Sequence, residues 1–227
     1  MTLAAAALTA LLAMPSQAAT LAGGKVGADA WFMDADVNSV EADDASTSGS
    51  YYAALEHPLP LIPNAKIRQT SVSVDNPDVD FDQIDFIAYY EFLDNDLVSV
   101  DAGINMQRFQ SGKFQGQSFD EWQPNVYVDA RVGLVGTPLN VFATVSKGEF
   151  DGTSTLDAEA GLIYQLGLVA ADLNVRGGYR MIEHDFDYFD NKGELDLTGF
   201  FVGAELDFLI PLFCQRYFPS RASARFF

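Results

Sequence analysis

The sequence has little of what most enzymatic and metal sites require. Its 227 residues include one cysteine, Cys214, and two histidines, His57 and His184. A single thiol cannot form an intrachain disulfide or a cysteine-based zinc site. The G-x-S-x-G, H-E-x-x-H and phosphate-binding glycine motifs are also missing. We therefore expect no catalytic residue, no metal site and no cofactor.

Basic residues are scarce as well. Lys and Arg together number 13 against 32 Asp and Glu, which gives a formal net charge of -19. A chain of this sign repels phosphate backbones, so nucleic acid is not an expected partner. After the first twenty residues there is no apolar run of about 18 residues, which excludes a helical membrane protein.

The N-terminus has the pattern of an export signal. An Ala- and Leu-rich run from Leu3 to Met14 precedes Pro15 and the small residues around Ala18, although no basic residue opens it. We predict a signal peptide over 1–18, with cleavage after Ala18 or one residue later.

The C-terminus changes composition abruptly. Residues 209–227 carry three basic residues, no acid and the cysteine. We interpret this segment as an atypical extension outside the folded domain at 19–208. A read-through or frame-shifted terminus and a basic membrane-surface tail are the two explanations.

Alternation of apolar and polar residues covers most of the chain between these ends. Between Trp122 and Leu134 the even positions are apolar or Pro, and the odd positions are mostly polar. Similar rows include Val98 and Val169. This period of two predicts strands with one apolar face. We predict ten strands, with eight as the alternative, at about 24–35, 48–57, 66–74, 81–92, 96–109, 121–134, 139–147, 155–165, 168–182 and 195–208.

Strand length separates a membrane barrel from a soluble one. Several segments reach the roughly 9–11 residues that a tilted strand needs to cross a bilayer. Their apolar faces carry almost no charge, as expected for a lipid-facing surface. Short connections alternate with mostly longer polar ones at about 36–47, 75–80, 110–120, 148–154 and 183–194, which predicts periplasmic turns and external loops. The all-β fold we expect is a closed antiparallel transmembrane β-barrel in the outer membrane. A soluble, lipocalin-like ligand-binding barrel would instead turn the Val98, Val126 and Val169 rows inward.

Three segments carry a resemblance to a known family. They are YYAALEHPLPLIPN at 51–64, AYYEFLDN at 88–95 and FVGAELDF at 201–208. Over about residues 21–208 the chain resembles a family of uncharacterised Gram-negative outer-membrane β-barrel proteins. The resemblance implies location and fold but no reaction or ligand. It also implies that Phe208 is the aromatic residue of the closing strand that the outer-membrane assembly machinery recognises, although nineteen residues follow it here.

The polar faces of the strands are expected to line the lumen and to fill it with paired charges. Asp207 belongs to the same inward rows. If Leu166 and Gly167 form a two-residue turn, Asp157 faces Arg176 across the hairpin. A selectivity ring in a narrow channel is the weaker alternative, because the excess acids would need compensation. The predicted network is Lys25, Asp29, Asp85, Asp101, Asp129, Arg131, Asp157, Glu159, Asp172, Arg176, Arg180 and Glu205.

These features favour a structural or surface-interaction role without catalysis. Outer-membrane lipid and lipopolysaccharide are the expected partners, and acidic loops could bind divalent cations weakly. One enzymatic alternative stays open: an outer-membrane hydrolase or protease with His184, Asp185 and Asp187 at its external rim.

Overall fold

A computed structural model of the chain describes residues 21–38, 40–41, 46–59, 61–74, 79–95, 97–114, 117–186 and 193–211. The predicted signal peptide at 1–18 and residues 212–227 lie outside these ranges. Among the described residues there is no helix long and apolar enough to cross a bilayer. The strands are β1 (Leu21–Val37), β2 (Val40–Glu41), β3 (Ser46–Glu56), β4 (Asn64–Val74), β5 (Val79–Asp94), β6 (Val98–Phe114), β7 (Gln117–Gly133), β8 (Leu139–Phe150), β9 (Thr153–Gly167), β10 (Ala171–Phe186) and β11 (Gly193–Pro211).

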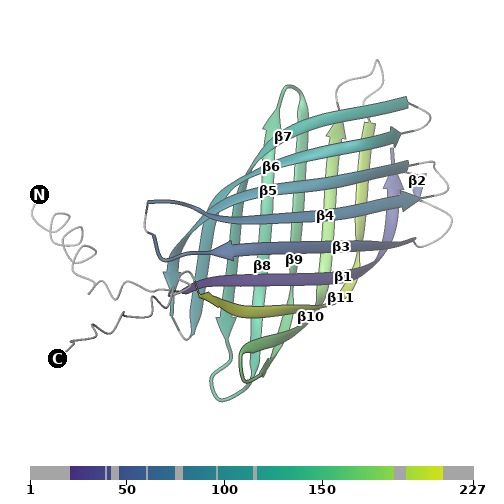
Figure 1. Ribbon diagram of the computed structural model, residues 1–227. Helices are drawn as coiled ribbons and strands as arrows, with labels where there is room; N and C mark the ends of the chain where they lie inside the picture. The colour runs from purple at the N-terminus through teal and green to yellow at the C-terminus, as the bar shows by residue number, and fades with distance from the viewer. Residues whose placement is uncertain are drawn as a thin grey trace, which may run out of the picture.

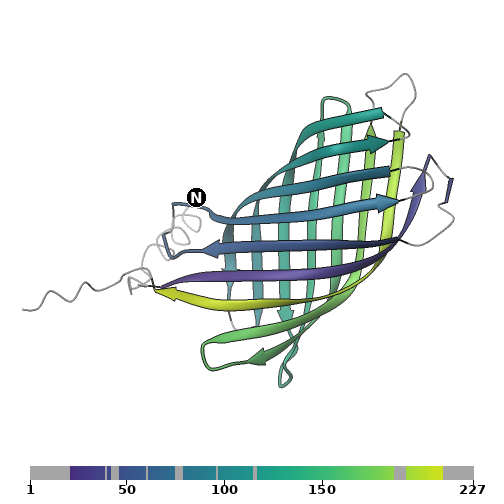
Figure 2. The same cartoon turned by 45° about the vertical axis from the view of Figure 1, so that its right-hand side comes forward.

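Ten of these strands form a closed antiparallel barrel (Figures 1 and 2). Each strand pairs with the next along the chain, and β1 pairs with β11 from Leu21 opposite Pro211 to Val37 opposite Leu195. The two-residue β2 pairs with the end of β1. The predicted ten-stranded barrel is confirmed, and the eight-stranded alternative is wrong. Strand β11 also runs three residues beyond the predicted domain end at Phe208.

The barrel has two different ends. We call the end at which β1 begins and β11 ends the proximal end, and the other the distal end (Figure 1). Three proximal connections, at 95–97, 134–138 and 168–170, are short, and the Pro-rich one at 57–63 is longer, as predicted. Two of the distal connections are shorter than predicted, because β6 to β9 extend into the expected loops at 110–120 and 148–154 and leave only residues 115–116 and 151–152 between the strands. Asp151 and Gly152 both have positive φ, the conformation of a type I′ hairpin turn.

The polarity of the wall reverses along the barrel axis, and β1 shows the reversal within one strand. Its proximal half turns Lys25 and Asp29 inward and apolar residues outward up to Phe32, which is 52% exposed. Its distal end turns Trp31 and Met33 inward, both essentially inaccessible, while the carboxylate of Asp34 is exposed. The inner and outer faces therefore exchange character near residues 31–34.

We call the proximal part with apolar outward residues the belt, and the distal part with polar outward residues the collar. Exposed belt residues include Val26, Ile67, Phe86, Ile104, Val126, Val128, Val145, Leu162, Val175, Phe200 and Val202. Outward collar residues include Asp34, Asp36, Ser71, Ser73, Asp80, Asp82, Asp120, Glu149, Ser154, Glu183, Asp185, Glu194 and Asp196. Many acids that the sequence assigned to loops thus lie on strands.

The collar encloses a small hydrophobic core. Its residues come from β1, β4, β5, β6, β10 and β11. Phe81 and Phe109 make an edge-to-face contact with ring centroids 5.8 Å apart, and the Trp31 indole nitrogen donates to the Gly199 carbonyl oxygen at 3.2 Å. The same buried cluster continues into the belt with Phe142, Ile163 and Phe201, and its collar residues are Trp31, Met33, Ala35, Val37, Val72, Val74, Val79, Phe81, Phe109, Ile182, Leu195 and Leu197.

Candidate functional site: the charged lumen

Inside the belt the lumen is crossed by ion pairs, and Arg68 on β4 is the centre of the layer next to the collar. Its Nε donates to Asp85 Oδ2 at 2.9 Å, and its Nη2 bonds to Asp157 on the opposite wall. Arg180 binds the same Asp157 through two atoms, at 2.8 and 3.1 Å. Both guanidinium groups and both carboxylates are buried. The bond between Arg68 and Asp157 ties β4 to β9 across the barrel.

Neutral amides complete the hydrogen bonding of Asp85 in this layer. The side-chain nitrogens of Asn105 and Gln107 donate to Asp85 Oδ1 at 2.9 and 3.0 Å, and Gln83 donates to both Asp85 and Asp157. A buried carboxylate that accepts several hydrogen bonds remains compensated after desolvation.

A second layer surrounds Arg176 on β10. Its Nη2 lies 2.6 Å from Glu159 Oε1, its Nε lies 3.3 Å from Asp29 Oδ1, and its Nη1 donates to the Tyr52 hydroxyl at 3.1 Å. The guanidinium carbon also lies over three aromatic rings, those of Phe142, Phe201 and Tyr52, at 4.7, 5.1 and 5.6 Å from their centroids. The Arg176–Tyr52 bond joins β10 to β3, which have β11 and β1 between them, so this layer also links strands that are not neighbours.

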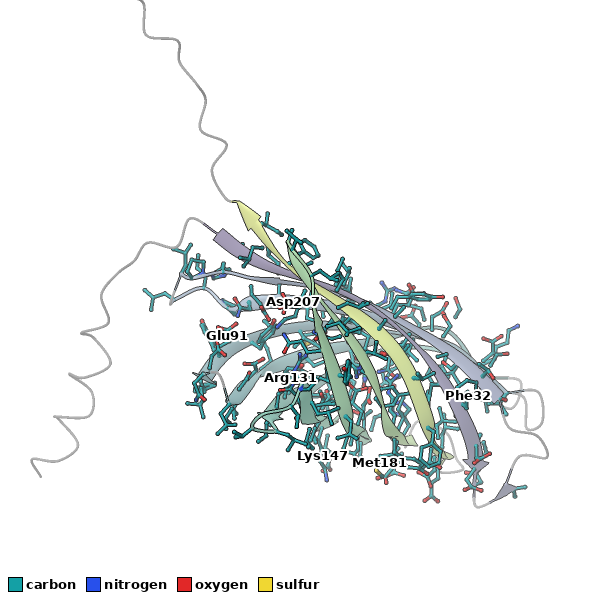
Figure 3. The ribbon with its side chains drawn as sticks, turned by 90° about the horizontal axis from the view of Figure 1, so that it is seen from below. Phe32, Glu91, Arg131, Lys147, Met181 and Asp207 are labelled. Atoms are coloured by element: carbon teal, nitrogen blue, oxygen red, sulfur yellow. The ribbon has the colours of Figure 1, made fainter. Side chains whose placement is uncertain are left out.

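The proximal layer contains Arg131, which Figure 3 shows inside the ring of strands. Its Nε lies 3.3 Å from Asp129 Oδ1 and its Nη1 lies 3.3 Å from Glu205 Oε1, which joins β7 to β11. Glu205 also accepts hydrogen bonds from Tyr52 at 2.8 Å and from Asn174 at 3.0 Å. The second and proximal layers are therefore one connected network.

Two cavities border Arg131. One of about 20 Å³ is lined by lysines, tyrosines and carboxylates, among them Lys66, Tyr127 and Asp101. This space is sufficient for about one water molecule. A second of about 150 Å³ lies at the proximal mouth, between residues that include Asn95, Asn140, Gln165 and Asp207.

The twelve residues predicted to line the lumen lie on the inner face of the belt or at its proximal mouth. Lys25 pairs with Glu56 at 2.5 Å. Asp101 differs from the other buried acids: within the described ranges it has no ion pair, and it lies opposite Asp129. Asp172 lies at the proximal mouth, directly opposite Asp207.

Sequence reasoning missed Arg68, the most connected cation, together with Lys66, Tyr52 and Glu56. The outward residues of β4 become polar at Gln69 and Ser71, so the apolar and polar alternation of this strand is weak. The available signal was the inward row itself, in which Arg68 and Thr70 precede two valines.

The predicted register between β9 and β10 is wrong. The turn lies at 168–170, so that Arg176 faces Ile163 and Asp157 faces Ile182. Strand β9 continues through Gly167 because Gly167 still pairs with Asp172. The displacement is an even number of residues, so every side chain keeps its predicted face. Asp157 consequently binds Arg180, and Arg176 binds Glu159.

The predicted rim site at His184 is also wrong. His184 is 1% exposed and points into the collar core, where its ring lies edge-on to Phe109 with centroids 4.6 Å apart. Asp185 is exposed on the other face of β10, because consecutive strand residues point in opposite directions. Asp187 lies outside the described residues. His184 and Asp185 therefore cannot converge on one open cleft.

The acidic residues of the collar do not form a metal site in the described part of the chain, where no three His, Cys, Asp or Glu side chains have suitable geometry. Asp196 nevertheless lies directly opposite Asp36 on one side and Glu183 on the other. Like charges directly opposite one another destabilise a sheet.

No family model matches the sequence, and a search of curated proteins gave no match. Among solved structures, the chain is similar to Neisserial surface protein A (18% identity, 81% of this chain and 96% of that chain, TM-score 0.41). It is also similar to the outer membrane protease OmpT from Escherichia coli (8%, 83% and 97%, TM-score 0.37) and to an outer membrane channel from Pseudomonas putida F1 (10%, 83% and 95%, TM-score 0.42).

The location of the chain follows from its own surface. The belt exposes large apolar side chains on all ten barrel strands, with Val126 at 64% and Phe200 at 70% exposure. A soluble protein rarely exposes so extensive an apolar surface. A closed barrel leaves no strand edge unpaired in lipid and is the architecture of bacterial outer-membrane proteins. The chain is an integral outer-membrane β-barrel. The outward rows containing Val98 and Val126 exclude the lipocalin-like alternative.

Proposed function

We propose that the protein is a non-enzymatic outer-membrane barrel with a structural or surface-interaction role and a lumen closed to solutes. The observation that carries this proposal is a set of bonds between strands that are not neighbours in the barrel: Arg68 to Asp157 on the opposite wall, Arg176 to Tyr52, and Arg131 to Glu205. Ten strands enclose a lumen only slightly wider than one that side chains fill.

Closure has two chemically different parts. The belt lumen is filled by charged and amide side chains, and the collar is filled by its hydrophobic core. A solute would have to break buried ion pairs and then pass an apolar constriction. Both steps carry a large free-energy cost.

The collar is the part of the molecule that we place outside the cell. Short turns face the periplasm in bacterial barrels, and an even strand number returns both barrel termini to that side. The strands support this arrangement, because β1 has 17 residues and β11 has 19, well above the roughly 9–11 needed to cross a bilayer. The excess length projects the collar from the membrane.

Fractionation and conductance measurements test the proposal. We expect the protein to sediment with outer membranes and to show heat-modifiable gel mobility. Reconstituted into planar bilayers, it should give no stable conductance steps under conditions in which a general porin conducts. Release with periplasmic proteins would refute the membrane assignment, and reproducible ohmic steps would refute the closed lumen.

Cysteine labelling tests the orientation separately. In a Cys214→Ser background, Glu149→Cys in the collar should react with a membrane-impermeant maleimide on intact cells. The matched control is Val135→Cys, which is 86% exposed in a proximal turn and should react only after lysis. Labelling of Val135→Cys but not Glu149→Cys on intact cells would reverse the orientation.

A further inference from the structure

The outward-facing basic residues of the barrel are confined to one sector. The described ranges contain nine Lys and Arg residues, of which six line the lumen. The remaining three are Arg108 and Lys113 on β6 and Lys147 on β8, and all three are exposed or partly exposed. Figure 3 shows Lys147 at the edge of the barrel, directed away from the interior.

Arg108 and Lys147 occupy equivalent places at the top of the belt. On β6 the outward row runs Ala102, Ile104 and Met106 before Arg108. On β8 it runs Val141, Ala143 and Val145 before Lys147. Each cation is thus the first charged outward residue above the hydrocarbon-facing row. If the belt lies in the bilayer, as the proposed function requires, both lie at the level of the outer-leaflet headgroups.

Trp122 on β7 lies between the two basic strands and completes the sector. It is directly opposite Arg108, whose guanidinium carbon lies 5.3 Å from the centroid of the indole ring. Trp122 is 46% exposed and stacks on Phe86 with ring centroids 5.8 Å apart. Tryptophan is enriched at the boundary between hydrocarbon and headgroups. We call Arg108, Trp122 and Lys147 the basic sector.

At the same boundary the outward residues of β3, β4 and β9 are uncharged, and those of four other strands are acidic. The first charged outward residues above the belt are Asp34 on β1, Asp82 on β5, Glu183 on β10 and Asp196 on β11. An anionic headgroup is repelled by these four strands and attracted to β6 and β8, which carry the three outward cations of the described residues. Among the described residues Arg108 has one ion pair, an exposed contact of Nη2 with Asp120 at 3.4 Å, and such surface pairs contribute little. The Gln110 amide oxygen accepts from Nη1 at 3.1 Å and from Nε at 3.3 Å, which leaves one N–H on each Nη nitrogen for a ligand.

We propose that the basic sector binds a phosphate group of the glycolipid of the outer leaflet, lipopolysaccharide, and orients one lipid molecule against β6–β8. Arg108 supplies the forked guanidinium donors that match a phosphate, and Lys147 supplies a second positive charge from the other side of β7. Trp122 packs against the upper part of an acyl chain. This inference rests on the proposed membrane location and extends it to one lipid class and one face.

Lipid binding to the detergent-solubilised barrel tests the inference. The protein is refolded in a neutral maltoside detergent, and binding is measured by native mass spectrometry. Bisphosphorylated lipid A, a dephosphorylated lipid A with the same acyl chains, and inorganic phosphate are titrated separately. We expect preferential binding of the bisphosphorylated lipid, an affinity at least about tenfold weaker for the dephosphorylated one, and no displacement by millimolar phosphate.

Variants identify the face. The double variant Arg108→Gln/Lys147→Gln should lose about tenfold or more in affinity for bisphosphorylated lipid A. The matched control, Asp34→Asn/Asp82→Asn, neutralises two boundary charges on other strands and should bind at least as well as the wild type. The wild type gives an independent test, because its binding should weaken with added salt.

Three results would overturn the inference: equal binding of the dephosphorylated lipid, displacement by inorganic phosphate, or unchanged binding by the double variant. Heat-modifiable mobility is recorded for every variant. A wild-type protein without it would contradict the membrane location, whereas a folded barrel without lipid selectivity contradicts only the lipid site.

Discussion

The belt and the collar are continuous parts of the same ten strands, yet they bury opposite chemistries. In the belt, apolar residues such as Val126 face outward while Arg68 and Asp157 are enclosed. In the collar, carboxylates such as Asp196 face outward while Trp31 and Leu197 are enclosed. The backbone does not decide which face is apolar. The surrounding medium does, because the side chains that face hydrocarbon must be apolar and those that face water need not be.

The two interiors also contribute differently to stability. Burying apolar side chains in the collar is favourable by itself. Burying ion pairs costs desolvation free energy that their attraction only partly offsets, so the belt network is a weak source of net stability. Removing one partner is nevertheless severe, because the other charge remains buried and uncompensated.

The largest effect is therefore expected from Arg68→Ala. This change leaves Asp85 and Asp157 without one of their cations and should lower the free energy of unfolding by about 3–5 kcal/mol. Urea titration in lipid vesicles, followed by tryptophan fluorescence, measures the loss. The matched substitution outside the barrel, Arg108→Ala, should cost at most about 1 kcal/mol. If both variants lost a similar free energy of unfolding, arginines in the lumen and on the outer surface would contribute equally to stability, which would contradict this comparison.

Leu197→Ala tests the collar core. Leu197 is fully buried, and its truncation leaves a cavity that should destabilise the barrel by about 2–5 kcal/mol. Leu162→Ala in the belt, where the side chain is 50% exposed, should cost less because lipid tails fill the space. The same titration compares them. If the two losses were equal, the collar would lack a packed interior.

Val126→Arg tests the outer face of the belt. An arginine that faces lipid near the bilayer midplane should cost about 2–4 kcal/mol. Ser154→Arg, on the outer face of the collar, should change the free energy of unfolding by no more than about 0.5 kcal/mol. The fraction of protein that shows heat-modifiable gel mobility after refolding measures the effect of each of the two variants. Equal tolerance of the two arginines would place the collar and the belt in the same medium.

The smallest effect concerns the acids of the collar. Burial, followed by the charges of Glu194, Glu183 and Asp185, raises the pKa of Asp196 above its ordinary value. Because the folded state binds this proton more tightly than the unfolded state, acidification through the range just above the ordinary carboxylate pKa should stabilise the barrel, and the gain is lost as pH rises.

Asp196→Asn should accordingly stabilise the protein at neutral pH by about 0.2–1 kcal/mol and flatten this part of the stability profile. Added salt should reduce the difference. A destabilised variant would show that Asp196 has a favourable partner. Urea midpoints at several pH values are sufficient to decide.

The sequence was sufficient to predict the barrel because alternation, strand length and strand number are local properties. It also placed the charges of β7, β9 and β10 on the inner face. It failed at β4 and in the collar for one physical reason: a fixed rule of apolar outside and polar inside applies only within hydrocarbon. Where β4 leaves the bilayer its outward residues become polar, so apolar and polar residues no longer alternate. The inward position of Arg68 therefore could not be predicted from its neighbours.

Pairings across the lumen were beyond sequence reasoning altogether. The bond between Arg68 and Asp157 joins strands far apart in the chain, and its existence depends on strand tilt and barrel closure. The β9–β10 register failed because Leu166 and Gly167 had suitable turn chemistry, although three further residues, 168–170, form the turn.

The seam between β1 and β11 has a consequence for biogenesis. These two strands are the most distant in the chain, yet they share an uninterrupted ladder from Leu21 to Val37. Until β11 pairs with β1, the backbone N–H and C=O groups along one edge of β1 have no strand partner. Such an edge can pair with other chains. We therefore expect the unpaired edge of β1 to need protection, by a chaperone or by the machinery that inserts the barrel, until β11 pairs with it.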